Sequence, residues 1–186
     1  MAHVSLIVLN APDRQSDDPR IDSWREALEA AGHTIDVQFP AGESGLTVRA
    51  IDGLREANGE VRVIVDAMRH YVAADLPRVV EPLVEGRAEV AVADGQLGGW
   101  RALAALLLKP ISGSADPFSG LVALTAEAFE RVEGHFKPVG RRFAFEILAR
   151  ARRNRLDVLV ESDRSVRFPA LGLDDLRHIK IGRAHV

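Results

Sequence analysis

An acidic side chain directly follows an apolar run that has the pattern of a buried strand. The run is Val61 to Val65, and the acidic residue is Asp66. Ligands of open α/β sheets bind outside the carboxyl ends of the strands, so Asp66 is the first candidate for chemistry. A divalent cation that holds a diphosphate prefers oxygen ligands, and such sites usually use two carboxylates. Here the second position is Met68. The sequence therefore predicts a phosphate-handling site that lacks one of its two expected carboxylates.

The elements that would position Asp66 alternate between strands and helices. Apolar or alternating runs predict strands at residues 3–9, 34–39, 61–65, 88–93, 121–124 and 158–160. The segments between them predict helices at residues 21–31, 47–57, 76–84, 100–108, 126–132 and 142–153. Because the order is repeated β-α-β, we expect a single α/β domain, with a mostly parallel, Rossmann-like sheet and helices on both faces.

Composition narrows the class of protein further. The chain has 186 residues, of which 47% are hydrophobic and 27% charged, as expected for one soluble globular domain. It has no cysteine, which excludes thiolate metal ligands and fits a reducing compartment, so the cytoplasm is the expected location. The net charge of -3 argues against a nucleic-acid partner. The longest apolar run, residues 102–108, is too short to span a bilayer.

Four motifs, in order, give the chain a resemblance to a known family. Gly45 to Gly53 looks like a glycine-started helix, and Asp66 to Pro77 matches the segment Asp-Ala-Asp-Leu-Gln-His-Pro-Pro-Glu-Asp-Ile-Pro without a gap. Lys109-Pro-Ile with Asp116 to Gly120 is similar to Arg-Pro-Leu and Asp-Pro-Met-Ser-Gly, and Pro138 to Leu148 is similar to Pro-x-Gly-Tyr-Lys-x-Leu-Leu-Glu-Ile-Leu. These motifs resemble those of family 2 glycosyltransferases of the dolichol-phosphate mannosyltransferase type, whose fold is called GT-A.

The resemblance implies roles for the residues at matching positions. Asp66 and Asp116 would be the catalytic carboxylates, and Asp66 with His70 would bind a divalent cation, Mg²⁺ or Mn²⁺. The nucleotide-sugar donor would contact Asn10, Asp13, Gly45 and Asp66. The acceptor would contact Asp116, Ser119, Arg142 and Glu146, the last two lying on one helical face. Plainer interpretations remain open, since Asp116 precedes a proline and suits a turn, and His70 could be a surface histidine.

A basic stretch also has two interpretations. Arg142 and the arginines between residues 150 and 155 could meet a polyprenyl phosphate or an anionic membrane surface, because guanidinium groups bind phosphate through paired hydrogen bonds. Alternatively, the late arginines belong to a solvated helix whose dipole they offset. Membrane association is therefore left open beside the cytoplasmic location.

Donor-side motifs depart most from the family pattern. Residues 34–39 run into Ala41 without the family's Asp-Asp-Gly-Ser, the metal-binding aspartate is Met68, and the arginine expected after residues 88–93 is replaced around Asp94. Two functions remain. The chain is either a hexosyltransferase that moves a sugar from a nucleotide-sugar to a polyprenyl-phosphate-type acceptor, or a pseudoenzyme that serves as a binding or scaffolding module. The missing carboxylates favour the second function.

The last six residues suggest an origin different from that of the rest of the chain. Ile181 to Val186 is the sequence that a common sequencing-library adapter gives when translated in frame. We therefore predict a GT-A-like domain at residues 1–180 and a non-native tail at residues 181–186.

Overall fold

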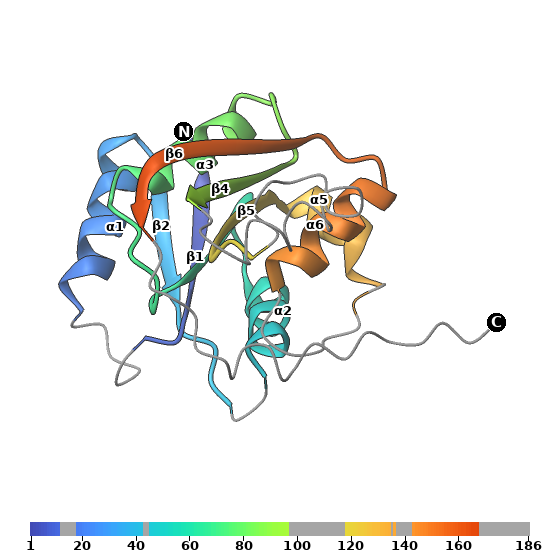
Figure 1. Cartoon of the computed structure of the whole chain (residues 1–186), viewed down its shortest axis with the longest axis horizontal. Coiled ribbons are helices and arrows are strands. Elements are labelled where there is room, and N and C mark those ends of the chain that lie inside the picture. The colour runs from blue at the N-terminus through green and yellow to red at the C-terminus, as the bar shows by residue number, and fades with distance from the viewer. Residues whose placement is uncertain (12–17, 43–44, 97–117, 135, 137–142, 168–186) are drawn as a thin grey trace.

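The computed structural model describes residues 1–11, 18–42, 45–96, 118–134, 136 and 143–167 (Figure 1). The strands are β1 (His3–Leu9), β2 (Thr34–Gln38), β3 (Val61–Asp66), β4 (Val90–Gln96), β5 (Leu121–Thr125) and β6 (Val158–Arg167). The helices are α1 (Pro19–Ala30), α2 (Leu46–Glu56), α3 (Asp75–Val84), α5 (Ala126–Glu133) and α6 (Phe143–Arg153). Each predicted strand is present, although β6 continues well beyond residue 160. The predicted helix at residues 100–108 and the predicted boundary at residue 180 lie outside the described residues.

The strands form one mixed sheet in the order β2-β1-β3-β5-β4-β6. β1 is parallel to β2 and β3, and β4 is parallel to β6, whereas β5 is antiparallel to both of its neighbours. The predicted α/β fold with a mostly parallel sheet is therefore confirmed. Because β5 is reversed, its amino end lies beside the carboxyl end of β3, where Leu121 pairs with Val65.

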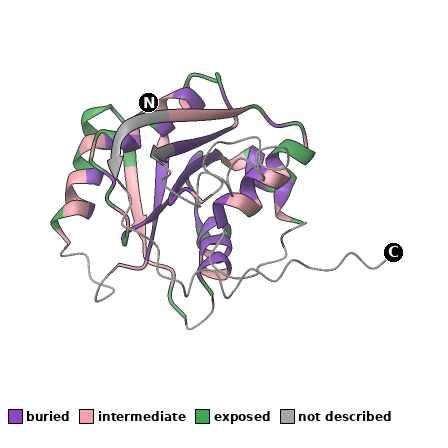
Figure 2. Cartoon of the chain, in the orientation of Figure 1, coloured by how far each residue is buried: buried purple, intermediate pink, exposed green. Residues whose placement is uncertain are grey.

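Helices cover both faces of the sheet, as the sequence predicted. On one face, buried side chains of α1 and α3 pack on the sheet, and Val63 points to this side. On the other face, buried side chains of α2, α5 and α6 pack on the sheet, and Ile64 points to that side. This alternation follows from the strand period of two. Figure 2 shows the buried residues concentrated along the sheet and on the helix faces turned toward it.

Helix α2 lies unusually close to β1. A Cβ atom on Gly53 would be 2.6 Å from Cγ2 of Ile7 and 2.7 Å from Cγ of Pro40, so only glycine permits this approach. Because α2 follows β2, which is parallel to β1, the first turn of α2 lies at the end of the sheet where the carboxyl end of β1 also lies. Arg49 in this turn is thereby brought within reach of residues that follow β1.

Candidate functional site

Asp66 ends β3 and is held by donors on both sides of its carboxylate. It is 8% exposed. Its Oδ1 accepts hydrogen bonds from Nδ2 of Asn10 at 2.9 Å and from the backbone N–H of Met68 at 3.1 Å. Its Oδ2 lies 3.7 Å from Nε of Arg69. The carboxylate is therefore oriented by the chain itself, at the carboxyl ends of two parallel strands.

Asn10 connects Asp66 to helix α2. It follows β1 with a φ of 56°, a left-handed conformation that asparagine adopts more readily than most residues. Its Oδ1 accepts a hydrogen bond of 2.8 Å from a terminal nitrogen of Arg49. Within the described part of the chain, Nε of Arg49 is buried and has no hydrogen-bond partner. Polar contacts thus connect four residues in series: Arg49, Asn10, Asp66 and Arg69. We call this series of side chains the arginine–aspartate chain.

The turn after β3 is fixed by contacts with the rest of the fold. The N–H of Ala67 donates to the carbonyl of Leu9 at 2.8 Å, and Arg20 donates to the carbonyl of Ala67 at 2.9 Å. Trp24, which is buried in α1, donates from Nε1 to the carbonyl of Tyr71 at 3.1 Å. These contacts give the residues after Asp66 a defined position against β1 and α1.

The residues just before β5 lie at the same end of the sheet as Asp66. Ser119 is 2% exposed, and its Oγ donates to the carbonyl of Ala93 at 2.7 Å and accepts from the N–H of Leu121 at 3.1 Å. The N–H of Gly120 donates to the hydroxyl of Tyr71 at 2.7 Å. A Cβ atom on Gly120 would lie 2.3 Å from Cδ of Arg69, so the absence of a side chain there makes room for the guanidinium group.

Asn10, Asp66 and Ser119, all proposed from the sequence, lie at this end of the sheet. Asn10 and Asp66 are in direct contact. The hydroxyl of Ser119 is engaged with the backbone around β4 and β5, and its role in acceptor binding stays a prediction. Gly45 precedes α2 at its amino end, with an extended ψ of 155°.

Other proposed residues have different partners or lie outside the residues that the structure describes. Glu146 lies in the first turn of α6 and forms an ion pair with Arg150, one turn later, whose guanidinium carbon is 5.1 Å from the centre of the Phe136 ring. Asp13, Asp116 and Arg142 lie outside the described residues, so the expected pairing of Arg142 with Glu146 stays a prediction.

A divalent cation does not fit the donor set that the described residues provide. Asp66 is its one carboxylate, and its oxygens already face Asn10, the Met68 N–H and Arg69. Met68 is 62% exposed and offers only a thioether, and His70 is exposed. Nowhere in the described ranges do three or more acidic or histidine side chains gather as a metal site would require. Such ions take six or more oxygen ligands, counting water.

Sequence reasoning missed the two arginines of the site and Tyr71. Arg69 occupies the position of a leucine in the matched segment, and its spacing of three residues from Asp66 was a usable signal, because residues three apart in a turn can pair. Arg49 offered no local signal, since its contact with Asn10 spans 39 residues of sequence. Tyr71 likewise reaches Gly120 across 49 residues.

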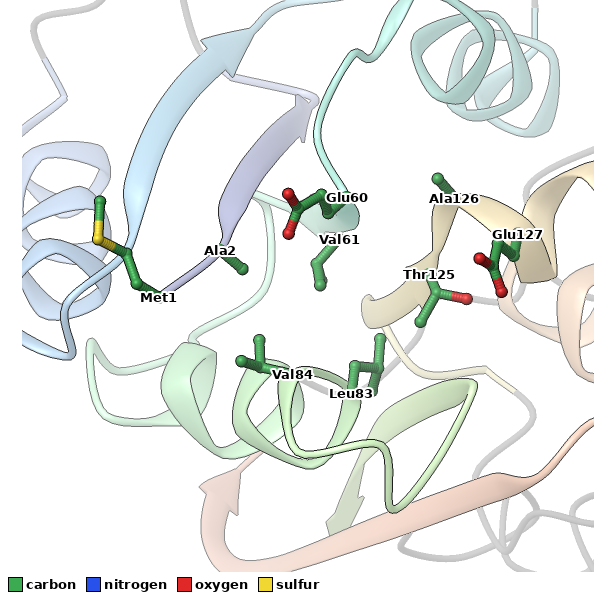
Figure 3. A pocket seen from close by; sticks show the side chains of 9 residues that line it. All are labelled: Met1, Ala2, Glu60, Val61, Leu83, Val84, Thr125, Ala126 and Glu127. Atoms are coloured by element: carbon green, nitrogen blue, oxygen red, sulfur yellow. The ribbon is translucent and has the colours of Figure 1, made fainter.

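A separate pocket of about 420 Å³ lies at the opposite edge of the sheet (Figure 3). Its lining includes Ala2, Val61 at the start of β3, Thr125 at the end of β5, and Leu83 near the end of α3. Asp66 ends the same strand that Val61 begins, so this pocket is unconnected with the arginine–aspartate chain.

Comparison with known proteins agrees with the resemblance seen in the motifs. The chain is 28% identical over 153 residues to a dolichol-phosphate mannosyltransferase from Pyrococcus furiosus, an alignment that covers 73% of this chain and 43% of that protein. It is 22% identical over 163 residues to a dolichol-phosphate mannosyltransferase from Mycosarcoma maydis, covering 81% and 54%. The chain thus spans about half the length of these relatives. No model of a known protein family matches it.

Solved structures establish the fold. Glucosyl-3-phosphoglycerate synthase from Mycobacterium tuberculosis, in complex with phosphoglyceric acid, superimposes with a TM-score of 0.70 and 16% identity, covering 94% of this chain and 75% of that one. Its complex with Mn²⁺, uridine diphosphate and phosphoglyceric acid gives a TM-score of 0.71 at 16% identity, covering 95% and 74%. The fold is therefore GT-A, and the suspected likeness to dolichol-phosphate mannosyltransferases is confirmed. In sequence and fold the chain is similar to glycosyltransferases.

Proposed function

We propose that this chain is a glycosyltransferase domain that binds a nucleotide-sugar at the carboxyl ends of β1 and β3. The single observation that carries the proposal is the position of Asp66, buried at the end of β3 and oriented by Asn10 and the Met68 N–H. A GT-A fold and the similarity to dolichol-phosphate mannosyltransferases support it. By that similarity, the acceptor is the phosphate of a polyprenyl-type lipid.

The chemistry is a displacement at the anomeric carbon of the sugar. A phosphate oxygen of the acceptor forms the new bond to this carbon, while the bond from the carbon to the diphosphate breaks and its electron pair leaves with the nucleoside diphosphate. A phosphate nucleophile needs little help from a base, so catalysis depends on positioning and on neutralising the leaving group. We assign Asp66 to the donor side of this site.

The resemblance implies Mg²⁺ or Mn²⁺, and the synthase from Mycobacterium tuberculosis has been crystallised with Mn²⁺ and uridine diphosphate or its glucose ester. A divalent ion would help by neutralising the diphosphate. The described residues around Asp66 fit such an ion poorly, so no step of the proposed transfer depends on it.

A second candidate function is favoured by one specific observation. The carboxylate of Asp66 already contacts Asn10, the Met68 N–H and Arg69, and the neighbouring position that would carry a second carboxylate is an exposed methionine. A domain that binds a nucleotide-sugar or a phosphorylated acceptor without transferring the sugar would tolerate this arrangement. In that case the chain is a binding or scaffolding module.

Transfer of labelled sugar from GDP-mannose and UDP-glucose to farnesyl phosphate separates the two functions. For an active transferase we expect lipid-linked label, and Asp66→Asn should lower the rate roughly 100-fold, because the residues that it positions would shift. Circular dichroism should show that the variant is folded. Donor binding by calorimetry without any transfer would favour the module. If neither donor binds, with or without Mn²⁺, the assignment of a donor site is wrong.

A further inference from the structure

We infer that the guanidinium groups of Arg49 and Arg69 bind the diphosphate of the nucleotide donor directly and take the place of a divalent cation. This inference rests on the proposed donor site and adds to it the groups that neutralise the diphosphate. The arrangement differs from the metal-dependent one that the resemblance implies, because Met68 stands at the position of the second carboxylate, and Arg69 and Arg49 lie on either side of Asp66.

The charged groups around Asp66 favour the binding of an anion. Arg69 lies on one side of its carboxylate, with Nε 3.7 Å from Oδ2. Arg49 lies on the other side and reaches it through Asn10. Among the side chains that the structure describes, two guanidinium groups therefore flank the carboxylate of Asp66. Such a site attracts an anion and disfavours a second cation, since like charges repel at short range.

The environment of Arg49 also favours phosphate binding. One terminal nitrogen donates to Asn10, whereas Nε is buried without a hydrogen-bond partner in the described part of the chain. A buried donor left unpaired costs free energy, so it is expected to have a partner in the functional state. A phosphate oxygen is a suitable partner, because the planar guanidinium group offers paired N–H donors that match two phosphate oxygens.

The fold also leaves space for the side chain of Arg69 beside Asp66. Its side chain passes over Gly120, where a Cβ atom would lie 2.3 Å from Cδ and 2.8 Å from Nε. The side chain of Arg69 is 18% exposed, so it lies at the surface of the site and not in the core. Gly120 is itself held by the Tyr71 hydroxyl. The fold thus fixes the guanidinium group of Arg69 beside Asp66 before any ligand arrives, which lowers the entropic cost of binding.

Asp66 then acts as a positioning residue. Its two oxygens hold Asn10 and Arg69, and Asn10 in turn holds Arg49. Arg20, by contrast, is bound to Asp18 with a contact of 2.6 Å and contributes a neutral pair next to the turn. Among the described arginines near Asp66, we therefore assign phosphate binding to Arg49 and Arg69.

Calorimetric titration with UDP and GDP tests the inference. We expect both the affinity and the stoichiometry in EDTA to equal those in Mn²⁺, and Arg69→Gln and Arg49→Gln each to weaken binding roughly 10- to 100-fold, the loss expected for a charge-assisted hydrogen bond. Arg69→Lys should restore only part of the affinity, because an ammonium group lacks the planar fork. Arg87→Gln is the matched control, since Arg87 is an exposed, ion-paired arginine that follows α3 at the far edge of the sheet.

The outcomes separate this inference from the proposed function. Nucleotide binding that requires Mn²⁺ and survives Arg69→Gln overturns the inference and leaves the donor site standing. Arginine-dependent binding of farnesyl phosphate in place of UDP and GDP also overturns it, because the guanidinium groups would then serve the acceptor. Absence of nucleotide binding under every condition counts against the donor site itself. Thermal unfolding midpoints equal to that of the unaltered chain show that each variant is folded.

Discussion

Gly120 is the residue of the site where a larger side chain would be accommodated least. A methyl group there would lie 2.3 Å from Cδ of Arg69 and 3.1 Å from Cβ of Asp66, so the arginine side chain has to move. We predict that Gly120→Ala weakens UDP or GDP binding at least tenfold. The expected cost in stability is about 1–3 kcal/mol, the range for inserting a carbon into a packed site. Calorimetry and urea denaturation measure the two effects.

Gly134→Ala is the matched control for this substitution. Gly134 follows α5 with a φ of -61°, and no atom lies within 4 Å of the Cβ position, so we expect alanine there to be neutral or slightly stabilising. Equal nucleotide binding by the Gly120→Ala and Gly134→Ala variants would show that Arg69 is not held by the space above Gly120.

At the residue scale, the sequence predicted the acidic centre of the site but not its cationic flanks. Asp66 could be predicted because a carboxylate after a buried strand is a local pattern, and Asn10 was named through the resemblance to the family. The role of Arg49 could not be predicted from the sequence. Its contact with Asn10 depends on how closely α2 packs on β1, and that distance is set by Gly53. Contacts of this kind exist only once the elements have been assembled.

Among the elements, α1 offers a test of electrostatics. Asp18 caps its amino end, accepting from the backbone N–H of Arg20 at 3.0 Å and from the guanidinium group of Arg20. The Arg20 side chain lowers the pKa of Asp18 below its ordinary value of 3.8. A carboxyl group with a lowered pKa in the folded state stabilises the protein above its unfolded-state pKa, and that contribution is lost as the pH falls through the folded-state value.

We therefore predict a pH-dependent effect of Asp18→Asn. Asparagine keeps an oxygen to cap the helix but loses the charge, so the variant should be less stable than the unaltered chain at pH 7 by up to about 1 kcal/mol. The difference should persist down to about pH 4 and disappear as the pH falls further. Urea denaturation at several pH values measures it. A difference that is constant from pH 7 to pH 2.5 would contradict the assigned cause.

The order and length of most elements were predictable, whereas the direction of β5 was not. Residues 121–124 are all buried, and a fully buried strand has the same apolar sequence in either direction. The reversal becomes evident only from the pairing of β5 with β3 and β4. Its effect on the site is direct, because a reversed β5 brings Ser119 and Gly120, rather than Thr125, to the edge that carries Asp66.

For the molecule as a whole, the single sheet predicts that both helical layers unfold together. Leu28 of α1 and Leu54 of α2 are completely buried on opposite faces of the sheet. Replacement of either by alanine should lower the free energy of unfolding by about 2–5 kcal/mol, because it leaves a cavity. Since both faces share the same strands, each variant should still unfold in one transition. Unfolding can be followed by far-ultraviolet and by near-ultraviolet circular dichroism. Different unfolding midpoints from the two signals would show that the two helical layers unfold independently.

The strand order also determines when the protein can complete its sheet during synthesis. β3 and β4 are separated in the sheet by β5, which comes after both in sequence. While the chain is being translated, β3 can pair with β1 at once. Its other side has no partner strand until residues 121–125 have been synthesised. Unpaired strand edges are where nascent chains aggregate, and distant strand pairings form slowly. Between the synthesis of β3 and that of β5, one side of β3 therefore has no native strand partner.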